Sequence, residues 1–305
     1  MKVLVTGASG FAGQWLIREL TSAGHEAVGA PPSSSLDITD AAGVHALLQS
    51  TRPDAVAHLA GLAFGPDAKR DPDRATAVNA DGTRHVVDAA GDIPVLVVSS
   101  AEVYGAPAAA DLPLREMAPL AADQPYGRSK VALERAVAEI GAAHVGRRAI
   151  LRPFNHIGPG QRPEFVVPAV ARRILEARDR GDSTIVAGNV DVRRDFSDVR
   201  DVVRAYRLVL EALAETTPTA IPWVYNVASG SSVAIRTIIE MLAAFAGIAI
   251  EVSIDPSLVR AADPPEIRGD ATRLSEDLGW QPMIPLETSL RDVLQDVERA
   301  YQGRD

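Results

Sequence analysis

A tyrosine and a lysine four residues apart are the residues of this sequence best suited to acid/base chemistry. In "QPYGRSK", Tyr126 and Lys130 have the i, i+4 spacing that places both side chains on one face of a helix. A free tyrosine ionises at about pH 10 and is a poor proton donor or acceptor at neutral pH. A neighbouring ammonium, and the positive nicotinamide of an oxidised cofactor, are expected to lower the pKa of the phenol, so that it exchanges its proton with a substrate oxygen.

The segment "SSAEVYG" places a hydroxyl and a carboxylate at the end of an apolar run. Ser100 and Glu102 follow "VLVV" and are two residues apart, with Tyr104 close behind. Two interpretations are open at this point. The segment forms either an acid/base site that takes protons from carbon, or a serine hydroxyl that assists the movement of a hydride.

Three glycines follow the first predicted strand and begin the first predicted helix. In "VTGASGFAG", Gly7 permits the tight turn, Gly10 lets backbone amides approach a pyrophosphate, and Gly13 lets the helix pack on the strand. Glycines in this strand, turn and helix context predict a dinucleotide site.

The end of the second predicted strand bears on which dinucleotide binds. An acidic residue there usually binds the ribose 2′-hydroxyl of NAD, but "VGAPPSSS" has no Asp or Glu before Asp37. The hydroxyls of residues 33–35 fit a 2′-phosphate, although no arginine is present in this stretch. We therefore favour NADP(H) and do not exclude NAD(H). Asp37 and Ile38 are expected to flank the adenine ring. For Asp40, capping of the following helix is an equally plausible role.

Short apolar runs alternate with helical patterns and predict the fold. Strands are predicted at 2–6, 25–29, 54–59, 95–100, 149–154 and 223–229. Helices are predicted at 11–23, 40–50, 75–90 and 126–141. In the last helix, Leu133, Val137 and Ile140 form one apolar stripe, and Glu134 is expected on another face. This alternation predicts an α/β fold, a doubly wound parallel sheet of the Rossmann type.

The second half of the chain has a different texture, rich in Gly, Pro and Arg. We expect a dinucleotide-binding domain at 1–152 and 190–228, and a smaller, mostly discontinuous C-terminal substrate lobe at 153–189 and 229–305. In "RDFSDVRD", Asp198 is expected to cap a helix, with Asp201 completing a capping box.

Composition excludes several classes of protein. The 305 residues include no cysteine, which rules out disulfides and thiolate metal sites and fits a reducing cytoplasm. The net charge of -9 argues against general nucleic-acid binding. No window approaches the length of a membrane helix, and the N-terminal apolar run is shorter than a signal peptide needs. We expect a cytoplasmic protein without a metal site.

Polar residues of the second lobe are suited to an anionic substrate. Asn155 in "RPFNHIGPGQ" lies at a strand end and is expected to bond a substrate diphosphate. Arg194, beside Arg193, and Arg260 supply the guanidinium groups that a nucleotide diphosphate needs in an acidic protein. Asp263 is expected to bind a nucleotide ribose.

Together these motifs resemble the extended short-chain dehydrogenase/reductase superfamily. The resemblance implies that Tyr126 is the proton donor, that Lys130 lowers its pKa and binds the nicotinamide ribose, and that Ser100 orients the substrate oxygen. Asn79 in "AVNADGT" matches an asparagine that supports the active-site side of the sheet. The resemblance also implies a homodimer through the helices 75–90 and 126–141. The expected cofactor contacts are Gly7, Gly10, Phe11, Gly13, Asp37, Ile38, Leu59, Ala60, Asn79, Ser99, Tyr126, Lys130 and Pro153.

The segments "RPFNHIGPGQ", "GNVDVRRDFSDVRD" and "RGDATRLSEDLGWQPMIPLETSL" narrow this resemblance. They resemble GDP-4-dehydro-6-deoxy-D-mannose reductases, which form GDP-D-rhamnose, over nearly the whole chain. Membership of that family implies reduction of the C4 ketone of a GDP-sugar by NADPH or NADH. The expected substrate contacts are Glu102, Asn155, Arg194, Arg260 and Asp263.

Relatives on the same scaffold provide the alternatives, which are 4,6-dehydratases and 4-epimerases. A dehydratase needs an acid and a base directly after the active-site serine, but Ala101 has no proton to give, so only Glu102 of that pair is present. A remote alternative is a non-catalytic dinucleotide sensor, which has no need of Ser100, Tyr126 and Lys130 together.

Overall fold

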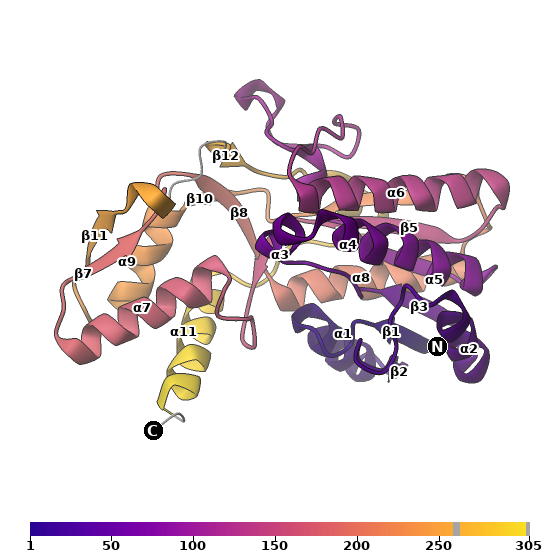
Figure 1. The fold of residues 1–305 in the computed structure, drawn as a ribbon, viewed down its shortest axis with the longest axis horizontal. Coiled ribbons are helices and arrows are strands. Elements are labelled where there is room, and N and C mark those ends of the chain that lie inside the picture. Colours follow the sequence, from indigo (N-terminus) through magenta and orange to yellow (C-terminus); the bar gives the residue numbers. More distant parts are fainter. Residues whose placement is uncertain (259–262, 303–305) are drawn as a thin grey trace.

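The computed structural model describes residues 1–258 and 263–302, which form a larger and a smaller lobe (Figure 1). Within these residues the main sheet has six strands in the order β2-β1-β3-β4-β5-β9, and every neighbouring pair is parallel. Its strands are β1 (Lys2–Thr6), β2 (Glu26–Gly29), β3 (Ala55–His58), β4 (Val95–Val98), β5 (Arg148–Pro153) and β9 (Trp223–Val227). The expected doubly wound parallel sheet is confirmed.

Helices cover both faces of this sheet because its strands are apolar on both sides. In β1, Val3 and Val5 pack on one face with α1 (Phe11–Ser22) and α8 (Val199–Glu215). Leu4 points to the other face. That face is covered by α2 (Ala41–Thr51), α5 (Gly82–Ala90) and α6 (Pro125–Ala143) (Figure 1).

The expected helix at 75–90 is interrupted in the structure. The chain runs through α3 (Gly65–Arg70), α4 (Pro72–Thr76) and a five-residue π-helix, η1 (Ala77–Asp81), before α5 begins. A π-turn holds one more residue than an α-turn, and such turns often lie at functional sites. Asn79 lies within η1.

The smaller lobe has its own apolar core. Its helices are α7 (Val166–Arg180), α9 (Ile235–Phe245) and α11 (Leu286–Gln302). Its strands are β6 (Asn155–Ile157), β7 (Thr184–Ala187), β8 (Arg193–Asp198), β10 (Ser232–Ala234), β11 (Glu251–Ile254) and β12 (Glu266–Ile267). The remaining elements are α10 (Thr272–Leu278), beside β9, and the short 3-10 helices η2 (Ala101–Tyr104), η3 (Ala109–Asp111) and η4 (Pro256–Leu258). The domain boundaries given above stay predictions.

The start of α8 joins the lobes, and it differs in one respect from the expected capping box. Asp198 caps the helix as expected, because its carboxylate accepts the N–H of Arg200 at 2.8 Å. Asp201 does not complete a box. Its carboxylate instead accepts the N–H groups of Met283 and Ile284, each at 2.8 Å, and so holds the segment before α11 against α8.

Helix α6 also differs from its predicted pattern. Glu134 was expected on a polar face, but only 5% of it is exposed. Its carboxylate pairs with Arg152 of β5 at 2.6 Å, so a charge on the second face of the helix is buried against a partner. The apolar stripe of α6 is buried as predicted, with Leu133 and Val137 in the core.

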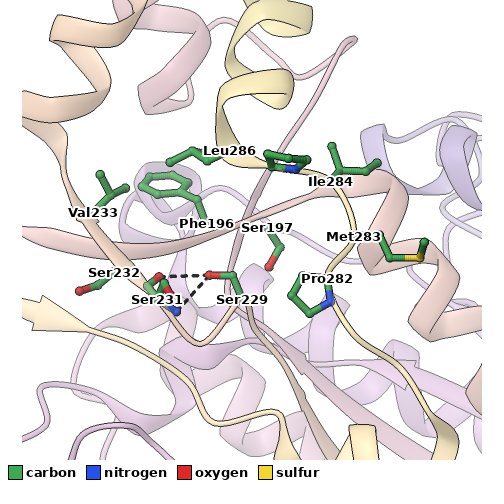
Figure 2. A pocket seen from close by; sticks show the side chains of 11 residues that line it. Phe196, Ser197, Ser229, Ser231, Ser232, Val233, Pro282, Met283, Ile284 and Leu286 are labelled. Carbon is green, nitrogen blue, oxygen red and sulfur yellow. Dashed lines mark hydrogen bonds between the residues drawn. The ribbon is translucent and has the colours of Figure 1, made fainter.

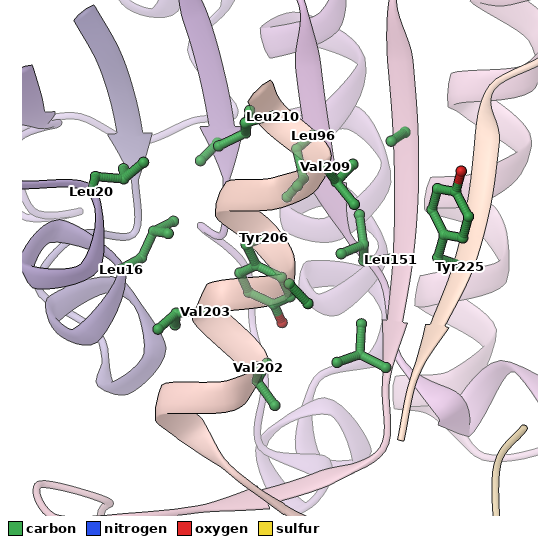
Figure 3. Close-up of a cluster of buried hydrophobic side chains, with 14 of the residues drawn as sticks. Leu16, Leu20, Leu96, Leu151, Val202, Val203, Tyr206, Val209, Leu210 and Tyr225 are labelled. Atoms are coloured by element: carbon green, nitrogen blue, oxygen red, sulfur yellow. The ribbon is translucent and has the colours of Figure 1, made fainter. Parts of the chain in front are cut away.

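Two buried tyrosines provide a matched test of this packing. The hydroxyl of Tyr206, on α8 among Leu96 and Leu151, has no hydrogen-bond partner within residues 1–258 and 263–302 (Figure 3). The hydroxyl of Tyr104 instead donates to Asn226 at 2.7 Å and accepts from Arg152 at 2.9 Å. We expect Tyr206→Phe to leave the free energy of unfolding unchanged or to raise it by up to about 1 kcal/mol, and Tyr104→Phe to lower it by about 1–3 kcal/mol. Urea unfolding of both variants measures the difference, and equal losses would contradict the assignment.

Candidate active site

The parallel strands bring the predicted residues to one edge of the main sheet. Thr6 at the end of β1 lies opposite His58 at the end of β3, and Val98 at the end of β4 lies opposite Leu151 of β5. The predicted residues that follow these ends are Gly7, Leu59, Ala60, Ser99 and Ser100, while Pro153 ends β5. Ligands of open α/β sheets bind at this edge.

The glycine turn after β1 has the geometry of a phosphate site. The N–H of Gly10 donates to the Gly7 carbonyl at 2.9 Å, which closes the turn. A Cβ at Gly13 would lie 2.1 Å from that carbonyl oxygen, so only glycine lets α1 approach so closely. No side chain of the described residues caps α1, and no acidic residue lies in its first turn. The N-terminal amides and the positive end of the helix therefore suit the pyrophosphate of a dinucleotide.

Ser100 and Tyr126 are brought together by two short elements. Ser100 is the N-cap of η2, and its Oγ accepts the N–H of Glu102 at 3.2 Å. At Gly127, in the first turn of α6, a Cβ would lie 2.6 Å from the Glu102 carbonyl, so the two backbones are in direct contact. The Ser100 hydroxyl, which accepts the cap bond, also lies close enough to the Tyr126 phenol to oppose a rise in its pKa.

The pKa of Tyr126 differs from the expectation. Burial raises it to about 12, the Ser100 hydrogen bond opposes this rise, and the nearby carboxylate of Glu102 adds to it. The expected lowering by Lys130 is not found in this protein structure. A phenol with a raised pKa keeps its proton at neutral pH, so Tyr126 is in the protonated form that a donor requires, although it is a weaker acid than free tyrosine.

Lys130 lies one turn along α6 and is almost fully buried. Its ammonium donates to the Val98 carbonyl at the end of β4 at 2.9 Å. Burial lowers the pKa of Lys130 to about 8, and the charge of Glu134 opposes this effect. Lys130 is therefore held against the same strand end that carries Ser100.

Asn79 joins the loop after β3 to α6. Its Oδ1 accepts the N–H of Leu62 at 2.9 Å, while its Nδ2 donates to the Leu62 carbonyl at 3.1 Å and to Ser129 Oγ at 2.8 Å. Ser129 in turn donates to the Tyr126 carbonyl at 2.7 Å. The Asn79 side chain is fully buried and bonded to protein at both ends, so it supports the tyrosine helix from behind.

His58 is a member of the site edge that the sequence did not reveal. Its ring lies between the hydroxyls of Thr6, at 2.7 Å, and Thr83, at 3.0 Å. Thr83 uses its own proton on the Asn79 carbonyl, at 2.6 Å, so it must accept from Nε2–H, and Nδ1 must accept from Thr6. Burial, with the charge of Lys130, lowers the pKa of His58 to about 3. His58 is therefore a neutral structural residue. A single histidine at a predicted strand end gives no indication of this role in the sequence.

The adenine side of the predicted site contains an arginine that the sequence argument missed. Asp37 accepts the backbone and hydroxyl of Thr39, which lowers the pKa of its carboxyl. Arg74 of α4 lies 3.8 Å from that carboxylate, although it is distant in sequence. Residues 33–35 are exposed nearby along the chain, and Asp40 caps α2 by accepting the N–H of Ala42 at 3.1 Å. Ile38 packs against Gly82 of α5.

The substrate-lobe segment after β5 lies directly on the dinucleotide turn. The ring of His156 stacks on Phe11, with centroids 5.9 Å apart, and burial lowers the pKa of that histidine. The indole of Trp15 donates to the Pro159 carbonyl at 3.0 Å. Asn155, at the start of β6, is exposed. This segment therefore connects the predicted cofactor and substrate regions.

Arg194 and Asp263, predicted separately to bind a diphosphate and a ribose, form an ion pair with each other. Arg194 also donates to the Pro264 carbonyl at 2.9 Å. The guanidinium is mostly buried and is fixed at the start of β8. Arg260 lies outside the described residues.

A hollow of about 340 Å³ lies in the smaller lobe (Figure 2). Its lining residue Val233 pairs with Arg194 in the sheet, and its lining residue Phe196 pairs with Asn155. It is lined by Phe196 and Ser197 of β8, by serines near β10 and by the segment before α11. No predicted site residue is among the residues that line it. The hollow therefore borders the strands that carry Arg194 and Asn155 without being lined by either residue.

Comparison with known proteins adds independent information on this arrangement. The family model of the NAD dependent epimerase/dehydratase family matches residues 3–228. The chain is 37% identical to a GDP-6-deoxy-D-mannose reductase of Pseudomonas aeruginosa, over 97% of each chain. It is 30% identical to a GDP-6-deoxy-D-talose 4-dehydrogenase of Aggregatibacter actinomycetemcomitans, over 100% of this chain and 98% of the relative.

Among solved structures, the chain is similar to RMD from Pseudomonas aeruginosa complexed with NADPH. The TM-score is 0.87 and the identity 36%, over 98% of this chain and 100% of that one. The likeness extends over both lobes.

The close contact at Gly13 gives a direct test of the dinucleotide turn. Gly13→Ala places a methyl group where the Gly7 carbonyl lies, so we expect a loss of dinucleotide affinity of at least tenfold, with reduced thermal stability. At Gly65, by contrast, a Cβ would meet no atom within 4 Å, and Gly65→Ala is the control. Fluorescence titration with NADPH measures both, and unchanged affinity in the Gly13 variant would contradict the assigned turn.

Proposed function

Because the chain belongs to the NAD dependent epimerase/dehydratase family, we propose that it reduces the C4 ketone of a GDP-4-dehydro-6-deoxyhexose. The substrate is GDP-4-dehydro-6-deoxy-D-mannose, and the product is GDP-D-rhamnose or its C4 epimer. The full-length similarity to a GDP-6-deoxy-D-mannose reductase supports this substrate class, and the similarity to a GDP-6-deoxy-D-talose 4-dehydrogenase supports the same reacting carbon.

The observation that carries the proposal is the proximity of the Ser100 hydroxyl to the Tyr126 phenol at the edge where the dinucleotide turn lies. A carbonyl oxygen placed beside these two hydroxyls accepts a hydrogen bond from each of them. Such bonds stabilise the negative charge that develops on the oxygen during reduction.

The reaction adds a hydride and a proton across the C4 carbonyl. A reduced dinucleotide held at the turn after β1 would supply the hydride to C4. Tyr126 gives its proton to the oxygen, which becomes the C4 hydroxyl, and the phenol is left as a phenolate. The Ser100 hydroxyl stabilises that phenolate directly. We propose that the Lys130 ammonium also stabilises it during turnover, although Lys130 is not among the groups that shift the pKa of Tyr126 in this structure.

The dinucleotide of this proposal is NADP(H), with NAD(H) as the alternative. The similarity to an NADPH complex supports this choice. The exposed hydroxyls of residues 33–35 and the guanidinium of Arg74, which the fold brings near Asp37, are groups suited to a 2′-phosphate. We propose no step through Asp37 itself.

The nucleotide diphosphate is assigned to the smaller lobe. Arg194 provides a mostly buried guanidinium at the start of β8, with Asp263 beside it for the ribose. Asn155 is exposed at the start of β6 and is free to approach a phosphate oxygen. Glu102, whose charge acts on Tyr126, is placed nearer the sugar.

A 4,6-dehydratase or 4-epimerase is the alternative within this family. Elimination needs a second proton-transferring group beside Glu102, and that position is held by Ala101. The raised pKa of Tyr126 also favours proton donation over proton removal. A non-catalytic dinucleotide sensor has no need of the Ser100 contact.

The cellular location and the oligomeric state complete the proposal. None of the described helices has the length and apolar character to cross a bilayer, and we propose a cytoplasmic location. We also propose a homodimer through η1, α5 and α6, which light scattering after size-exclusion chromatography tests.

Removing the Tyr126 hydroxyl tests the proton donor. Tyr126→Phe is expected to lower kcat by a factor of about 10³ or more while NADPH binding is retained, because the ring stays but the proton is lost. Tyr301→Phe, the same change on α11, is the control. Turnover is followed as loss of the reduced nicotinamide absorbance with GDP-4-dehydro-6-deoxy-D-mannose, and the sugar product is identified by NMR. Near-normal turnover in the Tyr126 variant would contradict its assignment as proton donor. Conversion of GDP-mannose without oxidation of NADPH would favour a dehydratase.

The titration of Lys130 predicts the pH dependence of the reaction. The pKa of Lys130 is about 8, and its charged form stabilises a phenolate whereas its neutral form does not. We therefore expect kcat/KM to fall as the pH rises through about 8. Tyr126 itself stays protonated over that range because its pKa is about 12. Initial rates between about pH 6 and about pH 10 measure this limb. A profile that stays flat to the alkaline end contradicts the role of Lys130.

A further inference from the structure

A buried group of polar side chains fills the space between α6 and the ends of β4 and β5. Glu134 and Arg152 are each 5% exposed, and Ser99 is 2% exposed. Both Glu134 oxygens bind Arg152, at 2.9 Å through Nε and at 2.6 Å through Nη2. Ser99 adds its hydroxyl at 2.6 Å to the oxygen that the Nε contacts. The carboxylate is thus held by three charge-assisted or hydroxyl bonds in fixed geometry.

Glu134 and Ser99 lie near the candidate catalytic residues along the chain, Glu134 one helical turn after Lys130 and Ser99 directly before Ser100. Lys130 and Glu134 are one turn apart on α6, on the same side. The Lys130 ammonium binds the Val98 carbonyl, and the hydroxyl of the next residue, Ser99, binds Glu134. Successive turns of α6 are therefore joined to successive residues of the β4 end, directly before Ser100.

We propose that Glu134, oriented by Arg152 and Ser99, is a positioning residue that keeps the Lys130 ammonium charged and seated on the end of β4. This inference rests on the proposed function of Lys130 and extends it to Glu134 and Arg152, which are not among the expected substrate or cofactor contacts.

The charges around Lys130 determine the sign of this effect. His58 of β3 is neutral, since its pKa is about 3, and it brings no charge. Glu134 is the carboxylate that favours the charged form of Lys130. From the other elements on this part of α6, η2 brings Glu102 beside the tyrosine, and β5 brings Arg152, whose charge is matched by Glu134.

The helices α3, α4 and α5 also pack against α6, and several of their charged groups form ion pairs at the surface. Arg84 of α5 pairs with Glu139 of α6 at 2.6 Å, and His85 lies on the Ile38 carbonyl at 3.2 Å. Arg70 of α3 pairs with Asp67. These groups leave Glu134 as the carboxylate of α6 that is turned inward beside Lys130.

A purely structural role for the pair makes a different prediction. Replacing a buried ion pair by apolar side chains of similar size often preserves stability, whereas removing one partner leaves an uncompensated charge. A structural pair can therefore be exchanged for two methionines without a change at Lys130. A positioning carboxylate cannot, because the ammonium loses its negative neighbour in both cases.

The chain allows the titration of Lys130 to be observed directly, because it contains three lysines, Lys2, Lys69 and Lys130. Protein labelled with ¹³C-lysine gives few Cε signals, which Lys2→Arg and Lys69→Arg assign. In the wild type the Lys130 signal is expected to titrate at about pH 8. In Glu134→Gln its midpoint is expected about one pH unit lower, because a neutral amide replaces the carboxylate.

Glu139→Gln is the matched control, since it makes the same change on an exposed carboxylate of α6 and is expected to leave the Lys130 midpoint in place. If Glu134→Gln does not fold, the paired replacement Glu134→Met with Arg152→Met restores charge balance. The Lys130 midpoint is expected to fall in that variant also. A wild-type midpoint in either folded variant overturns the proposal.

Kinetics provide the second readout. If the proposed reductase activity is present, the alkaline limb of kcat/KM in Glu134→Gln is expected to move to lower pH by the same interval, with the rate at about pH 6 largely retained. An equal loss of rate at every pH indicates a structural role and contradicts the proposal. The NMR titration needs no substrate, so failure of the proposed function and failure of this inference are distinguished.

Discussion

Because β1, β3, β4 and β5 pair in parallel, their carboxyl ends meet at one edge of the sheet, and the candidate catalytic residues lie along that edge. Each strand end supplies one part, from the phosphate turn after β1 to Pro153 at the end of β5. The register of the pairs decides which side chains lie abreast. A shift of one residue in any pair would turn each of its side chains to the opposite face of the sheet.

Burial at this edge acts on every titratable group and is opposed by few partners. It raises the pKa of Tyr126 and lowers those of Lys130 and His58, in each case favouring the neutral form. One bond or charge resists it at each catalytic group, the Ser100 hydroxyl at Tyr126 and the Glu134 carboxylate at Lys130. A small number of contacts, not a general excess of charge, therefore determines the pKa values of the catalytic groups.

The sequence predicted those parts of the fold and site that are encoded locally. The glycine spacing after β1, the i, i+4 pair on α6 and the Asp198 cap depend on a few neighbouring residues. Buried polar pairs do not. Glu134 has the polarity of a surface residue, and its burial follows from Arg152, which the fold brings from a neighbouring strand.

The same reason explains the other differences. Arg74 reaches Asp37 only because α4 folds back toward the second strand end, and the expected role of Asp201 in a capping box gave way to the amides of a segment about 80 residues away. The lowered pKa expected for Tyr126 considered the neighbouring charge without the desolvation that the packed helix imposes.

The π-helix η1 has a consequence for how this chain tolerates changes of length. Its wide turn carries one residue more than an α-turn, and Asn79 lies inside it with both ends of its side chain bonded. Deleting one residue here would let an uninterrupted α-helix form, but each helical residue turns by about 100°, so the asparagine would rotate away from Leu62 and Ser129. The connection between α4 and α5 is thus a segment in which residue number, more than residue type, is constrained, unlike a surface loop of similar length.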